Sequence, residues 1–571
     1  MVANHKVKET FFVLLLIVSA ALSYLLTNAT NEEGFYNSFT STINTGYMVQ
    51  LGITFAVFTI IIAVVFFLIS RRFSTKHTSN TSRLLNWKQV KREQRSLRDR
   101  YFYTKKEKGY YNDRITLPIS QNIKLTENGS YEHICAIVPT GGGKTSSVLL
   151  PQLVGDLEKD KVYEQLKDKK IEKGLDNASA VVTDPKGEIY RATAAIMQAK
   201  GYLTPHLDLT NPEKSIRYNL LQGCKTFDDV RKLAETILAS ADEQWAKLSR
   251  DLLEAFLFRS WEKGEGLAEV IEAIANSSDD TLEMELELFA EAGEEAQLAF
   301  KQFTKTAKGD GFVSSVFATI NGQLSVFKYN NLRHISNEPN FSFDMLREKK
   351  VILYISYPED EAAIYQPFLA SFYFQLMNQV KSHPSFNQGS NRGQKGYPVF
   401  FLLDEFANIG KLPDIDSFLS TIRSKAMCLE IFIQSYAQLS KQYGDKVANI
   451  IIENCKTKLT MAGVTNESAE LFSKLAGQTM VESTSVSLNG GNSVSTSTSK
   501  QAQQVVTADD IRRMKKYDLF IVSANLRPIK DDKMFIYYDK WDFWFLKHFT
   551  FLDEDKAVDL GRKIKKLIGK K

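Results

Sequence analysis

A glycine-rich loop follows the apolar run Ile134–Val138 and leads into a short helical pattern. It reads Pro139-Thr140-Gly141-Gly142-Gly143-Lys144-Thr145-Ser146. Glycines let the backbone turn its N–H groups inward around a phosphate, and the start of a helix favours an anion. In such a loop Lys144 reaches the β- and γ-phosphates, and the hydroxyl of Thr145 binds Mg²⁺. The loop therefore predicts a site at which the residues from Thr140 to Ser146 bind a nucleotide.

One position departs from the usual pattern of phosphate-binding loops. That pattern has a glycine six residues before the lysine, where this chain has Val138. Because the phosphates are held chiefly by the residues from Gly141 to Thr145, we expect the loop to bind nucleotide in spite of Val138. A plain glycine turn is the competing interpretation, and the apolar strand ahead of the loop disfavours it.

A second stretch supplies carboxylates. The apolar run Val399–Leu403 leads directly into Asp404 and Glu405. Asp404 is suited to hold the hydration shell of Mg²⁺, and Glu405 is suited to orient and polarise an attacking water. A buried strand that merely ends in two acids is the alternative. The upstream loop favours an ATPase in which the catalytic glutamate directly follows the Mg²⁺-binding aspartate.

Two other strand-like runs end in polar residues. Ala178–Asp184 places Asp184 where α/β sheets bind ligands, although no glutamate follows it, so it is the weaker candidate for the Mg²⁺-binding strand. Leu429–Ile433 ends at Gln434, which is suited to sense a γ-phosphate. In the helical stretch before that run, Arg423 is a candidate to reach the nucleotide of a neighbouring subunit, as arginine fingers do. A surface arginine is the competing interpretation.

The overall composition fits a protein of several domains. The chain has 571 residues, 43% of them hydrophobic, and a formal net charge of +5. Such a mild charge means that any nucleic-acid surface is local. The four cysteines form no CxxC pair, so we expect them to be reduced and mostly buried, in a cytoplasmic compartment. The seven histidines form no HExxH or HxH cluster, which argues against a zinc protease or a histidine–metal nickase.

Two apolar runs near the start, Phe11–Thr27 and Tyr47–Ser70, are long enough to cross a bilayer. A cleaved signal peptide is the alternative for the first run, but no convincing cleavage site follows it. Basic residues flank the outer ends of the pair, and none lies between the two runs. The positive-inside rule therefore predicts a two-span anchor at residues 1–72 of the cell membrane, with both termini in the cytoplasm.

The residues after the anchor divide by composition and periodicity. A basic stem at 73–116 fits anionic lipid, nucleic acid or a solvated linker, and all three stay open. The α/β pattern occupies 117–227 and 326–540. Between these parts, 228–325 reads as an all-α insertion that opens with a capping box of Thr226 and Asp229. Twelve acids against one lysine between Glu262 and Glu295 favour either a basic protein partner or a solvated face.

The last part of the chain gives weaker signals. Residues 482–500 are rich in serine and threonine around Asn489-Gly490-Gly491-Asn492, so they form a flexible loop or a weak hairpin. A late core strand is expected at Leu519–Val522. Residues 541–571 form a tail with clustered aromatic and then basic residues, suited to a core, a partner surface or solvent.

These motifs together resemble the TraG/TraD-type coupling proteins of type IV secretion and conjugation. The matching stretches are VPTGGGKTSS, VVTDPKGE, FLLDEFANIGKLPDID, IQSYAQLSKQYG and TADDIRRM, together with the two predicted spans and the all-α insertion. The resemblance implies an inner-membrane-anchored, RecA-like α/β P-loop ATPase that assembles as a hexamer. It also implies a motor that recruits a relaxase–DNA complex and drives single-stranded DNA into a type IV secretion channel.

Residue by residue, the resemblance implies that Lys144 and Thr145 bind ATP and Mg²⁺, and that Asp404 and Glu405 are the metal-binding and catalytic carboxylates. Gln434 corresponds to the sensor and Arg423 to a finger acting in trans. The insertion corresponds to the substrate-receiving domain. Two other functions stay open: a pump for double-stranded DNA of the FtsK kind, and a membrane receptor for protein substrates that uses ATP as a switch.

Overall fold

The computed structural model of the chain describes residues 83–93, 102–104, 117–154, 177–278, 280–307, 311–386, 396–489, 493–523 and 526–534. The chain divides into two units, Met1–Thr81 and Ser82–Lys571, and all described residues belong to the second. The expected spans at 11–27 and 47–70 and the tail at 541–571 lie outside the described residues. Within the described residues, no helix has the length and apolarity needed to cross a bilayer.

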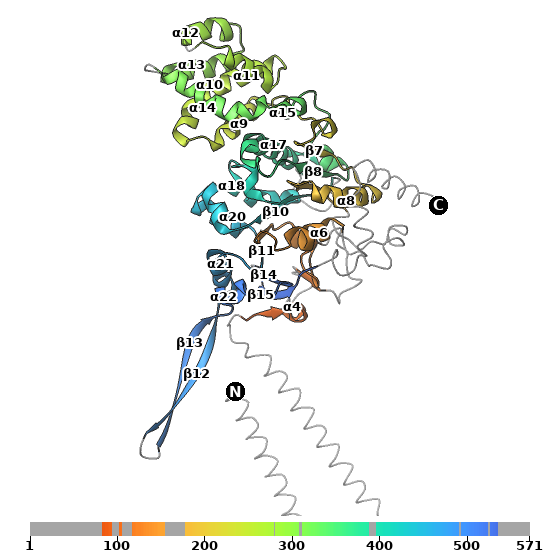
Figure 1. The fold of residues 1–571 in the computed structure, drawn as a ribbon, viewed down its shortest axis with the longest axis vertical. Helices are drawn as coiled ribbons and strands as arrows, with labels where there is room; N and C mark the ends of the chain where they lie inside the picture. Colours follow the sequence, from red (N-terminus) through yellow and green to blue (C-terminus); the bar gives the residue numbers. More distant parts are fainter. Residues whose placement is uncertain are drawn as a thin grey trace, which may run out of the picture. The chain divides into compact units, whose positions relative to one another are not determined.

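One ten-stranded sheet organises the described part of the chain (Figure 1). In spatial order its strands are β1 (Leu85–Asn86), β15 (Leu526–Asp532), β14 (Asp518–Ser523), β11 (Thr457–Met461), β5 (Ile134–Ile137), β10 (Met427–Ile433), β9 (Val399–Leu403), β6 (Ser179–Thr183), β8 (Ile352–Ser356) and β7 (His206–Asp208). The seven strands from β11 to β7 run parallel, whereas β14 is antiparallel to both of its neighbours.

The parallel strands are continuous apolar runs because helices cover both faces of the sheet. Alternate residues of β5 enter two separate cores: Ile134 and Ala136 one, Cys135 and Ile137 the other. On the first face lie α6 (Leu150–Val154) and α8 (Glu188–Ala199). The opposite face carries α17 (Ala362–Ser382), α18 (Ile415–Ile422), α20 (Asp445–Asn454) and α21 (Asn466–Ala476). The four cysteines are free and buried, as predicted.

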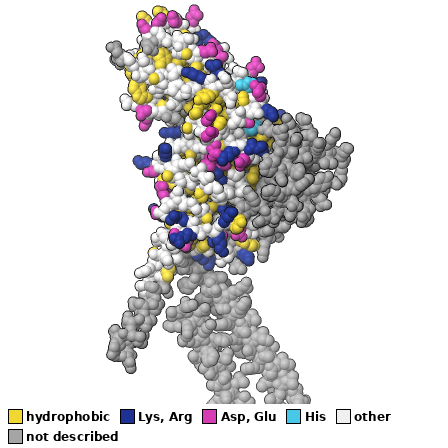
Figure 2. All heavy atoms as spheres, in the orientation of Figure 1, with side chains coloured by type: hydrophobic (Ala, Val, Ile, Leu, Met, Phe, Trp, Pro, Cys, Tyr) yellow, Lys and Arg dark blue, Asp and Glu magenta, His cyan; other side chains and the backbone are white. Residues whose placement is uncertain are grey.

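A helical insertion interrupts the sheet between β7 and β8. Its main helices are α9 (Phe227–Ile237), α10 (Glu243–Glu262), α11 (Leu267–Ala275), α12 (Thr281–Met284), α13 (Glu294–Thr306) and α14 (Phe312–Leu324). The predicted capping box is confirmed, because the Thr226 hydroxyl accepts from the N–H of Asp229 while the Asp229 carboxylate accepts from the N–H of Thr226. Figure 2 shows acidic side chains over the tip of this insertion, near α12. Exposed members are Glu283, Glu287, Glu291 and Glu294.

Parts of the expected basic stem belong to the folded body. Leu85 is buried, β1 pairs with β15, and α4 (Trp87–Glu93) contacts β15. Glu93 of this helix forms ion pairs with Arg83 and Arg527, each near 3 Å. Further along, β2 (Phe102–Thr104) pairs with β4 (Ile123–Leu125) in a small three-stranded sheet. Basic composition alone did not reveal these apolar anchor points.

The serine-rich segment forms a hairpin longer than its weak alternation suggested. Strand β12 (Gln478–Asn489) pairs antiparallel with β13 (Ser493–Gln504) along twelve residue pairs. It projects from the base formed by α21 and α22 (Ala508–Arg512) (Figure 1). The hairpin alternative is therefore the correct one for this segment.

Candidate nucleotide site

The glycine-rich loop is shaped by backbone conformations that favour glycine. Gly141 and Gly143 have φ angles of 74° and 88°, in the left-handed region. The loop closes through a hydrogen bond from the N–H of Gly142 to the carbonyl of Pro139, at 2.9 Å. The following helix starts with a π-helical turn, Thr145–Leu149, before α6 continues it. The sequence predicted a helix here but gave no sign of its wider first turn.

Val138, the departure from the usual loop pattern, is accommodated by a neighbouring glycine. Its side chain is buried, and its Cγ1 lies 2.6 Å from the place where a Cβ on Gly142 would stand. The carbonyl oxygen of Pro139 lies 2.9 Å from the same place. A side chain at position 142 would therefore clash with both atoms. Val138 and Gly142 form a complementary pair that keeps the loop narrow.

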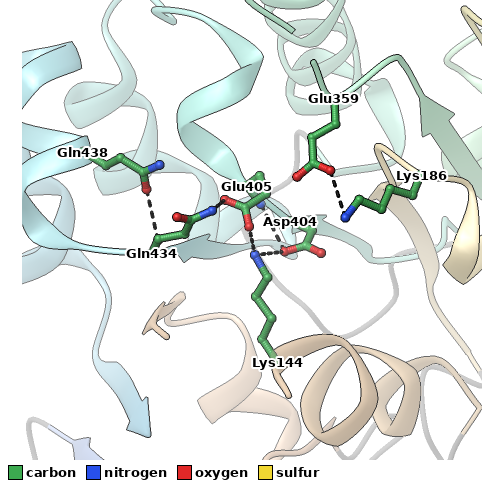
Figure 3. Close-up of polar contacts among 7 residues, drawn as sticks. All are labelled: Lys144, Lys186, Glu359, Asp404, Glu405, Gln434 and Gln438. Atoms are coloured by element: carbon green, nitrogen blue, oxygen red, sulfur yellow. Dashed lines mark hydrogen bonds and ion pairs between the residues drawn. The ribbon is translucent and has the colours of Figure 1, made fainter. Parts of the chain in front are cut away.

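Lys144 reaches both predicted carboxylates (Figure 3). Its Nζ lies 2.9 Å from Oδ1 of Asp404 and also forms a short ion pair with Glu405. Burial alone would lower the pKa of Lys144, but the two carboxylates outweigh it and raise that pKa above its ordinary value. For Asp404, burial has the opposite sign: it raises the pKa of the carboxyl group and outweighs the lowering effect of Lys144. The loop and the end of β9 therefore meet at one point.

Glu405 and Gln434 complete this cluster. Glu405 adopts a left-handed backbone conformation, with φ 52° and ψ 53°, which an L-residue holds at a cost of roughly 1–2 kcal/mol. Such strain concentrates at functional sites. The Gln434 amide donates to Oε2 of Glu405 at 3.2 Å, and its backbone N–H donates to the side chain of Gln438 at 3.1 Å (Figure 3). Gln434 is thus held beside the carboxylate suited to polarise water.

The strand order explains why residues so far apart in the chain converge. Strand β10 pairs with β5 on one side and with β9 on the other. All three are parallel, so the loop after β5, the acids after β9 and Gln434 after β10 share the carboxyl edge of the sheet. The sequence did not predict the spatial order of these strands in the sheet. It did predict the end of each of the three strands.

Asp184 lies at the same edge, one strand further along. The residue before it, Thr183, stands opposite Leu403, the residue before Asp404. One carboxylate oxygen of Asp184 accepts the N–H of Tyr190 at 2.7 Å, in the first turn of α8. Burial, reinforced by the nearby Asp404, raises the pKa of Asp184 to about 7. Asp184 therefore lies beside the cluster, with its carboxylate bound to the first turn of α8.

Three further residues lie beside the cluster, and two of them, Glu359 and Lys533, carried no recognisable sequence signal, whereas Lys186 belongs to the matching stretch VVTDPKGE. Lys186 and Glu359 form an exposed ion pair of 2.9 Å beside the cluster (Figure 3). Lys533, just after β15, donates from Nζ to the carbonyl of Gly142 at 2.8 Å. Burial lowers the pKa of Lys533 to about 8. Its contact joins positions that are 391 residues apart, which no local pattern could indicate.

Arg423 lies away from this cluster, at the amino edge of the sheet. It follows α18 and precedes β10, and its Nη2 lies 2.6 Å from Oε1 of Glu132, which precedes β5. Lys456 pairs with the other oxygen of Glu132 at 2.7 Å. The seven residues of β10 separate the two edges by about 20 Å. Arg423 therefore does not reach the cluster of its own chain.

The residues of the cluster fit a nucleoside triphosphate with Mg²⁺. The narrow glycine loop leaves no room for a side chain at Gly142, and Lys144 supplies one cation for phosphate oxygens. The Thr145 hydroxyl, partly exposed, and the Asp404 carboxylate are oxygen ligands of the kind that Mg²⁺ prefers. Glu405 and Gln434 lie where a water and a γ-phosphate would need partners.

Comparisons with known proteins agree with these features. A family model described as type IV secretory system conjugative DNA transfer matches residues 175–564. VirD4 of Rhizobium radiobacter is 23% identical over 431 residues, which cover 72% of this chain and 58% of VirD4. The coupling protein TraD of Escherichia coli strain K12 is 22% identical over 347 residues, which cover 58% of this chain and 46% of TraD. The chain thus spans less than two thirds of these relatives' length.

Among solved structures, the plasmid coupling protein TrwB in complex with the ATP analogue ADPNP matches with a TM-score of 0.57 and 15% identity. The match covers 82% of this chain and 96% of that one. TrwB in complex with ADP and Mg²⁺ matches with a TM-score of 0.55 and the same identity, over 81% and 96% of the two chains. At this identity the likeness concerns the fold, and it confirms the predicted RecA-like α/β architecture.

Proposed function

Since this chain belongs to the type IV secretory system conjugative DNA transfer family of coupling proteins, we propose that it is an ATP-driven DNA translocase. Its substrates are relaxase–single-stranded DNA complexes, and it delivers them to a type IV secretion channel during conjugation. It works as a homo-hexamer anchored in the cell membrane by spans at 11–27 and 47–70. The bulk of the chain and both termini are cytoplasmic, and membrane lipid and the channel proteins are its other partners.

The observation that supports this proposal most directly is the meeting of Lys144, Asp404 and Glu405 at one edge of the sheet. Bound ATP supplies the phosphoryl group whose transfer to water drives the motor, and Mg²⁺ neutralises its charge. Lys144 holds the phosphates, with the loop from Thr140 to Ser146 around them. Thr145 and Asp404 would hold Mg²⁺, and Asp184, which follows the strand next to that of Asp404, would contribute to nucleotide binding.

Hydrolysis needs a water held in line with the bond that breaks. Glu405 orients this water and accepts its proton, while Gln434, which already donates to Oε2 of Glu405, senses the γ-phosphate. Arg423, which does not reach the cluster of its own chain, is the candidate to act in trans on the nucleotide of a neighbouring subunit. The strained backbone of Glu405 fixes the carboxylate in advance of the reaction.

The test measures ATP hydrolysis by the full-length protein in detergent, with and without single-stranded DNA. Glu405→Gln is expected to lower the rate by on the order of 10²–10⁴-fold while ATP binding persists, and Lys144→Ala to lose both. Glu453→Gln, an exposed acid on α20, serves as the matched control and should keep the parent rate. Hydrolysis by Glu405→Gln at the parent rate would reject this base. A parent rate that DNA does not change would favour the ATP-switched receptor.

A further inference from the structure

A cavity of about 370 Å³ opens where the helical insertion meets the sheet domain. It lies between α9 and α17, which pack against each other (Figure 1), and next to the turn that precedes β10. We call it the lysine pocket. Its lining residues are Gly223, Lys225, Asp229, Lys232, Phe374, Gln375, Asn378, Gln379, Lys381, Ser382 and Lys425.

The charges around the lysine pocket are unbalanced. Four lysines line it, against one acid, Asp229. The Oδ2 of Asp229 already accepts the backbone N–H groups of Lys225 and Thr226, at 3.1 and 3.0 Å, within the capping box of α9. At the rim, Lys225 lies 3.6 Å from Asp344. The lining of the pocket therefore carries a net positive charge.

The other three lysines come from separate elements. Lys232 belongs to α9, Lys381 to the last turn of α17, and Lys425 to the turn before β10. Burial, followed by the charges of Lys425 and Lys232, lowers the pKa of Lys381 below its ordinary value. The repulsion of Lys381 by these two like charges is relieved when an anion binds among them. The geometry of the pocket thus favours an anionic ligand.

The walls of the pocket are held in place independently of any ligand. Arg347, fully buried, donates from Nε to the carbonyl of Val380 at 3.1 Å and from Nη2 to the carbonyl of Lys425 at 2.7 Å. It thereby fixes the backbone beside Lys381 and at Lys425. Opposite, the Gln379 amide donates to the carbonyl of Gly223 at 3.1 Å. The lysines are therefore presented from rigid positions, which reduces the entropy lost on binding.

A simpler account is that lysines near a helix C-terminus offset its dipole. This explains Lys381, which lies in the last turn of α17. It does not explain Lys232, which lies in the second turn of α9 and away from its C-terminus. It also does not explain why three separate elements contribute lysines to the same cavity. Two of these ammonium groups have partners in the fold, since Lys425 donates to the carbonyl of Phe386 at 3.2 Å and Lys381 lies 5.2 Å from the centre of the Phe418 ring. An anion in the cavity would act beside these contacts, and it accounts for the shared place of the three lysines.

The geometry points to a phosphate-binding site in the lysine pocket, formed by Lys232, Lys381 and Lys425. Lysine ammonium groups act as point charges for phosphate and read no base. The pocket's amides are engaged with its own walls, since Gln375 donates to the carbonyl of Leu220 and Asn378 to that of Phe374. Recognition is therefore independent of sequence. The phosphate belongs either to a nucleic-acid backbone, in which case the site serves the proposed translocase, or to a small free anion.

The test compares two double variants of the full-length protein in detergent. Lys232→Gln/Lys381→Gln removes two pocket charges, and Lys301→Gln/Lys305→Gln removes two exposed charges from α13 as a matched control. Both are made in a Lys144→Ala background, so that phosphate at the glycine-rich loop does not contribute. The readouts are binding measurements, so they stay valid even if the protein turns out not to hydrolyse ATP or move DNA.

The first readout is the affinity for a fluorescent single-stranded oligonucleotide over a series of salt concentrations. The pocket variant should bind about tenfold more weakly, and its logarithmic salt slope should flatten by about 0.7 for each phosphate that the variant no longer binds. The second readout is thermal stabilisation by inorganic phosphate at constant ionic strength. A change in the first readout supports the site with a nucleic-acid source. A change confined to the second supports it with a free anion. If the pocket variant matches the control in both, the site does not exist.

Discussion

The two edges of the central sheet handle charge in opposite ways. At the carboxyl edge, Lys144, Asp404 and Glu405 are nearly buried, with side-chain exposures of 12%, 10% and 11%, and the one lysine pairs with two carboxylates of the same chain. At the amino edge, Arg423 is 57% exposed and shares its acid, Glu132, with Lys456. The lysine pocket opens at this same edge. The carboxyl edge is therefore a self-contained site, whereas the amino edge has cations suited to groups from outside the chain.

The largest expected effect tests whether the amino edge serves catalysis. Arg423→Ala should lower ATP hydrolysis by about 10³-fold in the assembled protein, because an arginine finger stabilises charge in the transition state. Nucleotide binding should persist, since Arg423 does not touch its own cluster. The measurement is steady-state hydrolysis beside equilibrium binding of an ATP analogue.

Lys456→Ala is the matched control, because Lys456 shares Glu132 with Arg423. It should keep the rate within a few-fold, because the buried Glu132 keeps its ion pair with Arg423 in this variant. Equal losses in the two variants would mean that Arg423 acts through Glu132 and the fold. A parent-like rate in Arg423→Ala would leave the carboxyl edge as the whole of the catalytic machinery.

An intermediate effect is expected at the carboxyl edge from a residue that touches neither metal-binding group. Lys533→Met should weaken ATP-analogue binding by about tenfold, because the loop loses its hydrogen bond to the carbonyl of Gly142. Calorimetric titration measures the change. Lys516→Met, a nearby exposed lysine, should bind like the parent. If both variants bind equally well, the glycine loop holds its shape without help from β15.

The smallest effect concerns the strand that links the two edges. Glu430 in β10 is fully buried, and burial raises its pKa to about 8, with Gln152 opposing. Between about pH 4.5 and 8 the unfolded chain releases this proton and the folded chain keeps it, so stability falls as pH rises. Glu430→Gln removes this slope and should melt roughly 5 °C above the parent at pH 8, with little difference at pH 5. If the melting temperatures of the parent and the variant differ by the same amount at pH 5 and at pH 8, Glu430 is ionised in the folded protein.

Local patterns predicted the strands well. The run Val399–Leu403 is strand β9 without change, and Leu429–Ile433 is the second part of β10. Continuous apolar runs ending in polar residues are distinctive because parallel strands are buried on both faces. The same reasoning located Lys144, Asp404, Glu405 and Gln434, since each follows a strand end.

Contacts between distant parts of the chain could not be predicted. The place of β10 between β5 and β9, the bond of Lys533 to Gly142 and the hydrogen bonds of Arg347 all join residues far apart in sequence. Arg347 stands in an unremarkable helical turn, and nothing in its neighbours indicates that it will be buried against four carbonyls. Asp184 was predicted at the correct edge, but its bond to the N–H of Tyr190 depends on how α8 begins.

The hairpin of β12 and β13 has a consequence for solubility. Within the described residues its two strands pair only with each other, so each has an outer row of backbone groups that the ribbon itself does not satisfy. Such rows invite edge-to-edge association and fibre formation when the flanking side chains are apolar. Here serine and threonine dominate both strands. The composition thus guards an extended arm against self-aggregation while leaving it able to accept one more strand.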